Sequence, residues 1–396
     1  MKKDRILTSI EIIFPVPLRV LFLIFLGPLL YSLNLKGLSN YNINYGRIFN
    51  TTPTNNEEDI ILDKKLKKIF IYLFLGIFLP SLFYFNFYLL NNVKINLESD
   101  PQWQFSISHV FLLSIFLSLL LLLMPVDYFF KQERYYFLKL VYKIIFCNYN
   151  STILFSEVLL ADMLTSYSRI LGDLFSLTWL TIFNNTNKSL LLYNEILTPL
   201  IIAIPFFLRL KQCCIEFFNN NEKQYKHLSN ALKYASAFPV IFLSPIISKL
   251  IYNEELILNY WLFYLWLVFI MFNSLYSFYW DLVMDWDLYF KWRNNNEYRN
   301  INNNDDNYDS VATYSSNKYN ILNRELLFKE PIIYYIIVVI NLLLRITWVL
   351  KLTQSSHINQ SPITDFLLEL LELFRRFFWI FLRMEKEYLS MYMSFL

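Results

Sequence analysis

Glycine, cysteine and histidine are scarce in this chain of 396 residues, which holds five, three and three of them respectively. Five scattered glycines cannot form the glycine-rich loops that hold nucleotide phosphates. Two of the cysteines, Cys213 and Cys214, are neighbours, a spacing that suggests no disulfide framework. No cysteine or histidine spacing is typical of a metal site, so we expect neither metal nor cofactor. These absences argue against an enzyme.

Charged residues are also few: they make up 17% of the chain, against about 25% in a typical soluble protein. Hydrophobic residues account for 56% and come in long blocks. Blocks of about 20 apolar residues can cross a bilayer as helices. The sequence therefore predicts an all-α polytopic membrane protein. The expected spans are Val16–Leu35, Ile69–Leu90, Ile107–Met124, Phe155–Phe183, Leu190–Leu210, Tyr234–Tyr252, Tyr260–Trp280, Ile332–Lys351 and Phe366–Met384.

We divide the chain into N-terminal transmembrane helices and loops (residues 1–150) and a transmembrane core (residues 151–396). Residues 291–330 interrupt the core with an asparagine-rich stretch that also holds many bases, and we expect a flexible cytosolic loop there. Basic residues near both ends of the chain predict that both ends are cytosolic. Nine crossings would place the ends on opposite sides, so we predict a tenth crossing or a re-entrant segment within Val126–Phe146.

Charged residues occur inside several of the predicted spans, where they are costly unless they face a protein interior or a water-filled cavity. Asp162, Thr165, Arg169 and Asp173 recur at helical spacing and predict one polar stripe along Phe155–Phe183. The whole intramembrane set has five acids (Asp162, Asp173, Asp281, Asp285 and Glu372) and six bases (Arg169, Arg209, Lys233, Arg345, Arg375 and Arg376).

The near balance of these charges predicts a charge-lined pathway in the last six helices. Acids and bases in these numbers can pair and leave a slight positive surplus, which suits an anion, and arginine forks suit phosphate oxygens. Asp281 and Asp285 are four residues apart, which would place both on one face of a helix. Each charge taken alone could instead be interfacial, with its side chain reaching the headgroups.

Six segments resemble, in order, the signature segments of the EXS-domain family. The most distinctive is Tyr-Ser-Phe-Tyr-Trp-Asp-Leu-Val-Met-Asp-Trp at 276–286, and the others lie at 159–166, 204–213, 227–234, 342–348 and 372–385. This family holds phosphate exporters of the retrovirus-receptor type, plant root-to-shoot phosphate exporters and a short fungal Golgi protein. The larger exporters carry an N-terminal inositol-phosphate-sensing domain, and its lack ahead of the first helix here points to the short Golgi type.

The resemblance implies about ten transmembrane helices, which favours a tenth crossing, and it implies a phosphate path. The implied lining residues are Asp162, Arg209, Lys233, Tyr234, Asp281, Arg345, Trp348, Arg375 and Arg376, and we include Thr165, Ser168, Asp285 and Glu372. Thr165 stands where the exporters often have asparagine, and Ile380 replaces an asparagine of the last segment. The polarity of the path near the last helix could therefore differ from that of the exporters.

The expected function is transport of inorganic phosphate from the Golgi lumen to the cytosol by a multi-pass Golgi membrane protein. Such transport would support glycosylation and the retention of luminal proteins of the endoplasmic reticulum and of Golgi glycosyltransferases. The alternative is a sorting adaptor that binds glycosyltransferases or coat adaptors without moving phosphate. The expected partners are phosphate, the lipid bilayer, glycosyltransferases, a coat adaptor and a second copy of the chain, with no nucleic acid.

Overall fold

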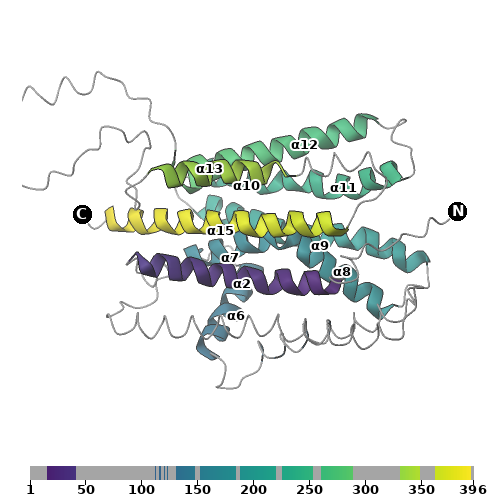
Figure 1. Ribbon diagram of the computed structural model, residues 1–396, viewed down its shortest axis with the longest axis horizontal. Coiled ribbons are helices and arrows are strands. Elements are labelled where there is room, and N and C mark those ends of the chain that lie inside the picture. Colours follow the sequence, from purple (N-terminus) through teal and green to yellow (C-terminus); the bar gives the residue numbers. More distant parts are fainter. Residues whose placement is uncertain are drawn as a thin grey trace, which may run out of the picture.

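The computed structural model describes residues 16–41, 131–147, 152–183, 188–219, 225–252, 260–288, 331–347 and 362–393, with four positions between 112 and 123. Every regular element in these ranges is a helix (Figure 1). The elements are α2 (Val16–Asn40), α6 (Lys131–Ile145), α7 (Phe155–Ser166), α8 (Ser168–Ile182), α9 (Lys188–Asn219), α10 (Tyr225–Ala235), α11 (Ala237–Tyr252), α12 (Tyr260–Tyr279), η2 (Trp280–Asp285), α13 (Ile332–Arg345) and α15 (Pro362–Met393). The all-α prediction is confirmed for this part of the chain.

Three stretches of the described helices are long and apolar enough to cross a membrane: Val16–Asn40, Tyr225–Leu250 and Tyr260–Asp285. The second combines α10 with most of α11, and the third combines α12 with η2. The apolar helix α13 is shorter. Helices α9 and α15 have 32 residues each and are therefore about 48 Å long, which exceeds the thickness of a bilayer core. These lengths and compositions support a membrane protein.

The spans predicted at Ile69–Leu90 and Ile107–Met124, and the loop 291–330, lie wholly or mostly outside the described residues.

The span predicted over Phe155–Phe183 is not one helix, because Tyr167 separates α7 from α8. The Tyr167 hydroxyl donates a hydrogen bond to the carbonyl oxygen of Ile24 on α2 at 3.2 Å. Gly27 lies directly under the tyrosine ring, and a Cβ atom at this glycine would lie 1.7 Å from the hydroxyl oxygen. The turn at Tyr167 therefore depends on a glycine of the neighbouring helix.

A methyl group at position 27 should be poorly tolerated. Gly27→Ala places its Cβ atom against the Tyr167 ring, so the ring must leave its site, at a cost of about 1–3 kcal/mol. Gly37→Ala is the matched control on the same helix, since among the described residues its Cβ atom would meet Phe381 alone, at 3.4 Å. Thermal unfolding in detergent should show a lower midpoint for Gly27→Ala alone. Equal midpoints for both variants would contradict this packing.

Helices α2 and α15 lie side by side and run in the same direction (Figure 1). The ring of Phe22 lies 6.2 Å from that of Phe366, and farther along both helices Asn34 donates a hydrogen bond to the carbonyl oxygen of Phe377 at 3.0 Å. Helix α7 runs the opposite way, because Arg383 near the end of α15 stacks on Phe155 at the start of α7. If both α2 and α15 cross the bilayer, they cross it in the same direction.

These directions bear on the topology that the sequence suggested. If α2 and α15 both cross the bilayer, α2 begins on the membrane side opposite to the end of α15, which disagrees with the expectation that both ends are cytosolic. The spans predicted at Ile69–Leu90 and Ile107–Met124 lie wholly or mostly outside the described residues, so the number of crossings stays a prediction.

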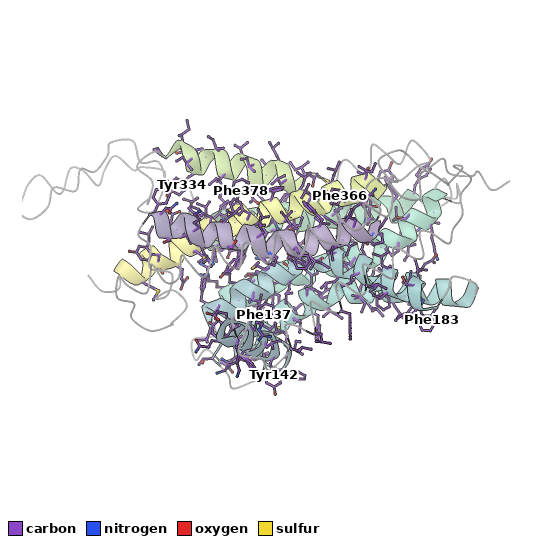
Figure 2. The ribbon with its side chains drawn as sticks, turned by 60° about the horizontal axis from the view of Figure 1, so that its bottom comes forward. Phe137, Tyr142, Phe183, Tyr334, Phe366 and Phe378 are labelled. Carbon is purple, nitrogen blue, oxygen red and sulfur yellow. The ribbon has the colours of Figure 1, made fainter. Side chains whose placement is uncertain are left out.

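Helix α6 occupies most of the segment Val126–Phe146, where a tenth crossing was predicted. It is not among the apolar helices of the described part of the chain, and four of its 15 residues are basic. Phe137 and Tyr142 are exposed and project at the margin of the bundle (Figure 2). Lys143 pairs with Glu157 of α7 at 2.9 Å. Exposed aromatic rings beside basic residues are typical of a helix that lies along a membrane surface.

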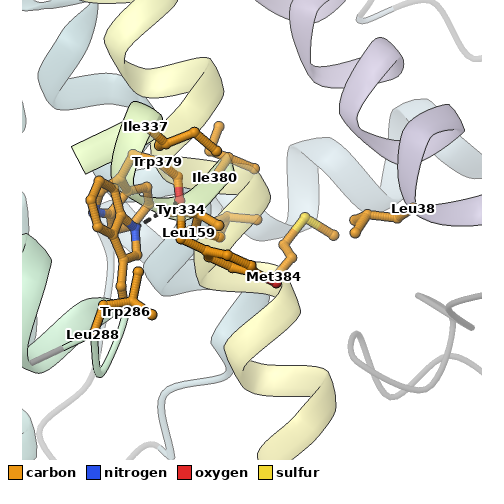
Figure 3. Close-up of a cluster of buried hydrophobic side chains, with 10 residues drawn as sticks. Leu38, Leu159, Trp286, Leu288, Tyr334, Ile337, Trp379, Ile380 and Met384 are labelled. Atoms are coloured by element: carbon orange, nitrogen blue, oxygen red, sulfur yellow. Dashed lines mark hydrogen bonds between the residues drawn. The ribbon is translucent and has the colours of Figure 1, made fainter. Parts of the chain in front are cut away.

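A cluster of buried apolar side chains fixes one end of the bundle, and five elements or their flanking residues contribute to it (Figure 3). Its members are Leu38, Leu159, Trp286, Leu288, Tyr334, Ile337, Trp379, Ile380, Leu382 and Met384. The indole nitrogen of Trp286 donates a hydrogen bond to the carbonyl oxygen of Trp379 at 3.3 Å. This contact ties the residue after η2 to α15, so the charged residues on these two elements are held in fixed positions.

Candidate functional site

A polar cavity of about 240 Å³ lies between helices α7 to α13 and α15. One water needs only about 10–15 Å³ on this measure, so the cavity can hold a small anion together with water. Five bases and three acids line it: Arg169, Lys233, Arg345, Arg375 and Arg376, with Asp281, Glu369 and Glu372. The hydroxyl groups of Thr165, Ser166, Ser168, Ser274, Ser277 and Thr347 also line it. The charged groups of the lining carry two positive charges in excess.

Asp281 is the acceptor on which several of these donors converge. Arg345 donates to its Oδ2 atom from Nε at 3.1 Å and from Nη2 at 2.5 Å, and Asn341 donates to the same atom at 3.1 Å. The Nη1 atom of Arg375 lies 3.5 Å from it. The side chain of Asp281 is 2% exposed, so the carboxylate depends on these donors. It joins η2, α13 and α15.

The backbone around Asp281 is a π-helical turn, η2, at the end of α12. The amide of Trp286 donates to the carbonyl oxygen of Asp281 at 2.9 Å, five residues back. Turns of this kind are rare and often occur at functional sites. Asp285 pairs instead with Lys233 of α10 at 3.7 Å and accepts a hydrogen bond from the Trp379 indole at 3.3 Å. The two aspartates predicted to share a helix face therefore both contact α15, but their other partners lie on different helices, α13 for Asp281 and α10 for Asp285.

Three charged residues of α15 form a second group, in contact with α7. Glu372 accepts two hydrogen bonds from Arg375, at 2.8 and 2.6 Å, and a third from Ser166 at 2.8 Å. Arg376 donates to the hydroxyl oxygens of Ser166 at 2.8 Å and Thr165 at 3.0 Å. The Ser166 hydroxyl thus links a base to an acid, and both the acid and the bases of this group face the cavity.

A third group lies behind the cavity wall and is fully buried. The Nε atom of Arg209 on α9 lies 2.9 Å from the Oδ1 atom of Asp162 on α7. Tyr234 of α10 donates a short hydrogen bond to the same Asp162 oxygen. Arg209 also donates to the side-chain oxygen of Gln212 at 3.1 Å. Asp162 and Arg209 do not line the cavity, whereas Tyr234 does.

Lys233 connects the groups, because its ammonium faces both the cavity and two aromatic rings. It lies 4.6 Å from the ring centre of Tyr234 and 5.4 Å from that of Trp280, within the range of cation–π attraction. Its pairing with Asp285 is loose at 3.7 Å. A base held mainly by aromatic faces keeps its hydrogen-bond donors available for a ligand.

The structure brings most of the predicted pathway residues together. Those that line the cavity are Thr165, Ser168, Lys233, Tyr234, Asp281, Arg345, Glu372, Arg375 and Arg376. Asp162, Arg209 and Asp285 lie one contact behind it, bonded to Tyr234 or Lys233. Trp348 lies outside the described residues. Of the predicted stripe, Thr165 and Arg169 line the cavity, whereas Asp162 and Asp173 do not.

Some polar residues at the site were not among the predicted pathway residues. Asn341 lies one turn before Arg345 on α13, and this spacing alone could have indicated it. Ser166 follows the predicted residue Thr165, and Glu369 lies one turn before the predicted residue Glu372. Both line the cavity. Ser277 lies one turn before Asp281 and lines it too.

Comparison of the sequence with those of known proteins identifies the family of the chain. The EXS family model matches residues 14–389. "Protein ERD1 homolog 1" of Schizosaccharomyces pombe is 28% identical over 282 residues, which cover 69% of this chain and 68% of the relative. "Xenotropic and polytropic retrovirus receptor 1 homolog" of Xenopus laevis is 27% identical over 376 residues, 91% of this chain and 48% of the relative. Human "Solute carrier family 53 member 1" is 26% identical over 289 residues, 68% of this chain and 37% of the relative. The last two relatives are thus matched over less than half of their length. Because the family model covers nearly all of the sequence, the chain belongs to the EXS family.

Proposed function

We propose that this protein transports inorganic phosphate across the Golgi membrane, from the lumen to the cytosol. The observation that carries the proposal is the cavity, with five bases and three acids gathered between apolar helices. Such charges are costly inside a membrane protein unless they serve a polar ligand or water. A surplus of two positive charges matches the charge of hydrogenphosphate. One relative is named as a solute carrier, which agrees with transport.

The donors of the cavity suit a tetrahedral oxyanion. Arg375 has a buried Nη1 atom that makes no hydrogen bond to the described residues, and the residue lines the cavity. Arginine forks and serine hydroxyl groups are the usual partners of phosphate oxygens. The three acids keep the arginines placed and compete with the anion for them. Binding therefore stays weak enough for release, which conduction requires.

The proposed setting is a Golgi membrane in which glycosylation releases phosphate into the lumen when nucleotide-sugar products are broken down. Return of this phosphate to the cytosol would sustain glycosylation and, through it, the retention of glycosyltransferases and of luminal proteins of the endoplasmic reticulum. The resemblance of the signature segments to the short fungal Golgi type is the basis for this location. Imaging of the tagged protein should show Golgi membranes. Labelling of the plasma membrane alone would contradict this location.

Purified protein in liposomes should take up radiolabelled phosphate, and Arg375→Gln should lose most of the uptake. This change removes the charge and the fork that bridge Asp281 and Glu372, each hydrogen bond to a charged group being worth about 1.5–3 kcal/mol. Lys249→Gln is the control, because Lys249 is 56% exposed and pairs with Glu195 outside the cavity. Absence of phosphate uptake by the unaltered protein would refute transport.

The same variant separates transport from the alternative role as a sorting adaptor. If retention of glycosyltransferases depends on flux, cells with Arg375→Gln should leak these enzymes while the variant protein stays abundant and correctly located. Normal retention together with lost flux would show that the adaptor role is independent of phosphate. The glycosyltransferases, a coat adaptor and a second copy of the chain remain proposed partners.

A further inference from the structure

We propose that the cavity selects oxyanions that carry a proton, such as hydrogenphosphate, and rejects fully deprotonated ones, such as sulfate, through the carboxylates of Glu372 and Asp281. This inference rests on the proposed function and names the substrate class of the same site. Sulfate and hydrogenphosphate are tetrahedral dianions of similar size, so the positive surplus of the cavity favours both. Only a group that senses the proton can separate them.

Both carboxylates keep an acceptor position toward the cavity. The side chain of Glu372 is 34% exposed, and its Oε2 atom accepts one hydrogen bond, from Arg375 at 2.8 Å. A carboxylate oxygen has about two acceptor sites, so one remains on Oε2. All the donors to Asp281 meet at Oδ2, and within the described part of the chain none of its hydrogen bonds is to Oδ1.

The bases and the hydroxyl groups of the lining cannot make this distinction. Arginine and lysine only donate hydrogen bonds, so they bind sulfate and phosphate oxygens alike. Serine and threonine hydroxyl groups rotate to donate or accept, so they adapt to either anion. A carboxylate only accepts. It can bind the O–H group of hydrogenphosphate, but it repels a sulfate oxygen that has no hydrogen to offer.

Four anions test the rule in proteoliposomes made from the full chain. Phosphate and arsenate bear a proton at neutral pH, whereas sulfate and monofluorophosphate are dianions without an O–H group. Uptake of the first two should exceed that of the last two by about 10- to 100-fold, the ratio expected for an unmade hydrogen bond to a charged group. Monofluorophosphate is the sharpest probe, because it replaces only the O–H group.

Glu372→Gln should relax this selection. The amide nitrogen of glutamine can donate a hydrogen bond to a sulfate oxygen, so the sulfate-to-phosphate ratio should rise about tenfold. Glu157→Gln is the matched control, because Glu157 is 4% exposed, pairs with Lys143 and does not line the cavity. Its ratio should equal that of the unaltered protein.

Each result of these uptake measurements supports or overturns the proposed selection. Equal uptake of phosphate and sulfate by the unaltered protein would overturn the selection while transport of phosphate stood. A Glu372→Gln protein that loses both anions in proportion would assign Glu372 to structure alone and overturn its part in selection. If that variant does not fold, the comparison of phosphate with monofluorophosphate in the unaltered protein still gives the answer. Failure of the unaltered protein to move phosphate at all would refute the proposed function instead.

Discussion

Replacing Arg345 with glutamine should lower phosphate flux by about tenfold or more and leave the protein folded. Arg345 is 14% exposed, lines the cavity and binds Asp281 through two nitrogens, so its fork lies between a fixed carboxylate and the space for the anion. Loss of a hydrogen bond to a charged group costs about 1.5–3 kcal/mol. An energy of this size corresponds to a reduction in flux of about tenfold or more. The fold should survive because Asp281 keeps Asn341 and Arg375.

Two further substitutions at this position identify what the flux requires. Arg345→Lys should also lose most of the flux, because a single ammonium does not reproduce a planar fork. Arg345→Leu distinguishes a cavity-lining arginine from one that faces lipid, since a lipid-facing arginine could be replaced by leucine without loss. Phosphate uptake should be measured beside the amount of folded protein. Normal uptake by Arg345→Leu would remove α13 from the pathway and weaken the case for transport.

The identity of the charged residues at the site could be predicted because buried charge requires a partner. The near balance of intramembrane acids and bases in the sequence predicted pairing, and the structure pairs Asp162 with Arg209, Asp281 with Arg345 and Glu372 with Arg375. Which acid meets which base could not be predicted. It depends on helix neighbours that no spacing along one helix reveals.

The helix break at Tyr167 could not be predicted from the spacing of polar residues. A continuous helix would place Asp162 and Asp173 on one stripe, but Tyr167 separates α7 from α8. Asp281 and Asp285 both contact α15, yet they pair with different bases, Arg345 and Lys233. These pairings depend on contacts between helices distant in sequence.

The direction of the helices was the other feature beyond sequence analysis. Basic residues gave conflicting sides for the two ends of the chain, and a tenth crossing was one way to reconcile them. In the structure α2 and α15 pack in parallel, as the contact of Asn34 with Phe377 shows, which would put the two ends of the chain on opposite sides if both helices cross. The number of crossings stays a prediction, because the segments that would decide it lie outside the described residues.

Asp162→Asn should abolish folding rather than alter transport. Asp162 is the only acid within 4 Å of Arg209 in the described part of the chain, and both side chains are 4% exposed. Removal of the carboxylate leaves a buried guanidinium without a counter-charge, which costs about 3–5 kcal/mol. That is a large part of the stability of a typical protein. The amount of monodisperse protein after size exclusion should fall steeply, as it should for Arg209→Gln.

The double variant, Asp162→Asn with Arg209→Gln, should regain much of the folded protein, because it removes both charges and keeps side chains that can hydrogen-bond. Tyr234→Phe is the graded control: it deletes one hydrogen bond to Asp162 and keeps the ion pair, so it should cost only about 1–3 kcal/mol. A folded Asp162→Asn protein with lost phosphate flux would contradict this assignment. It would show that the carboxylate meets the anion directly, and that the cavity extends past Tyr234 toward Arg209 during transport.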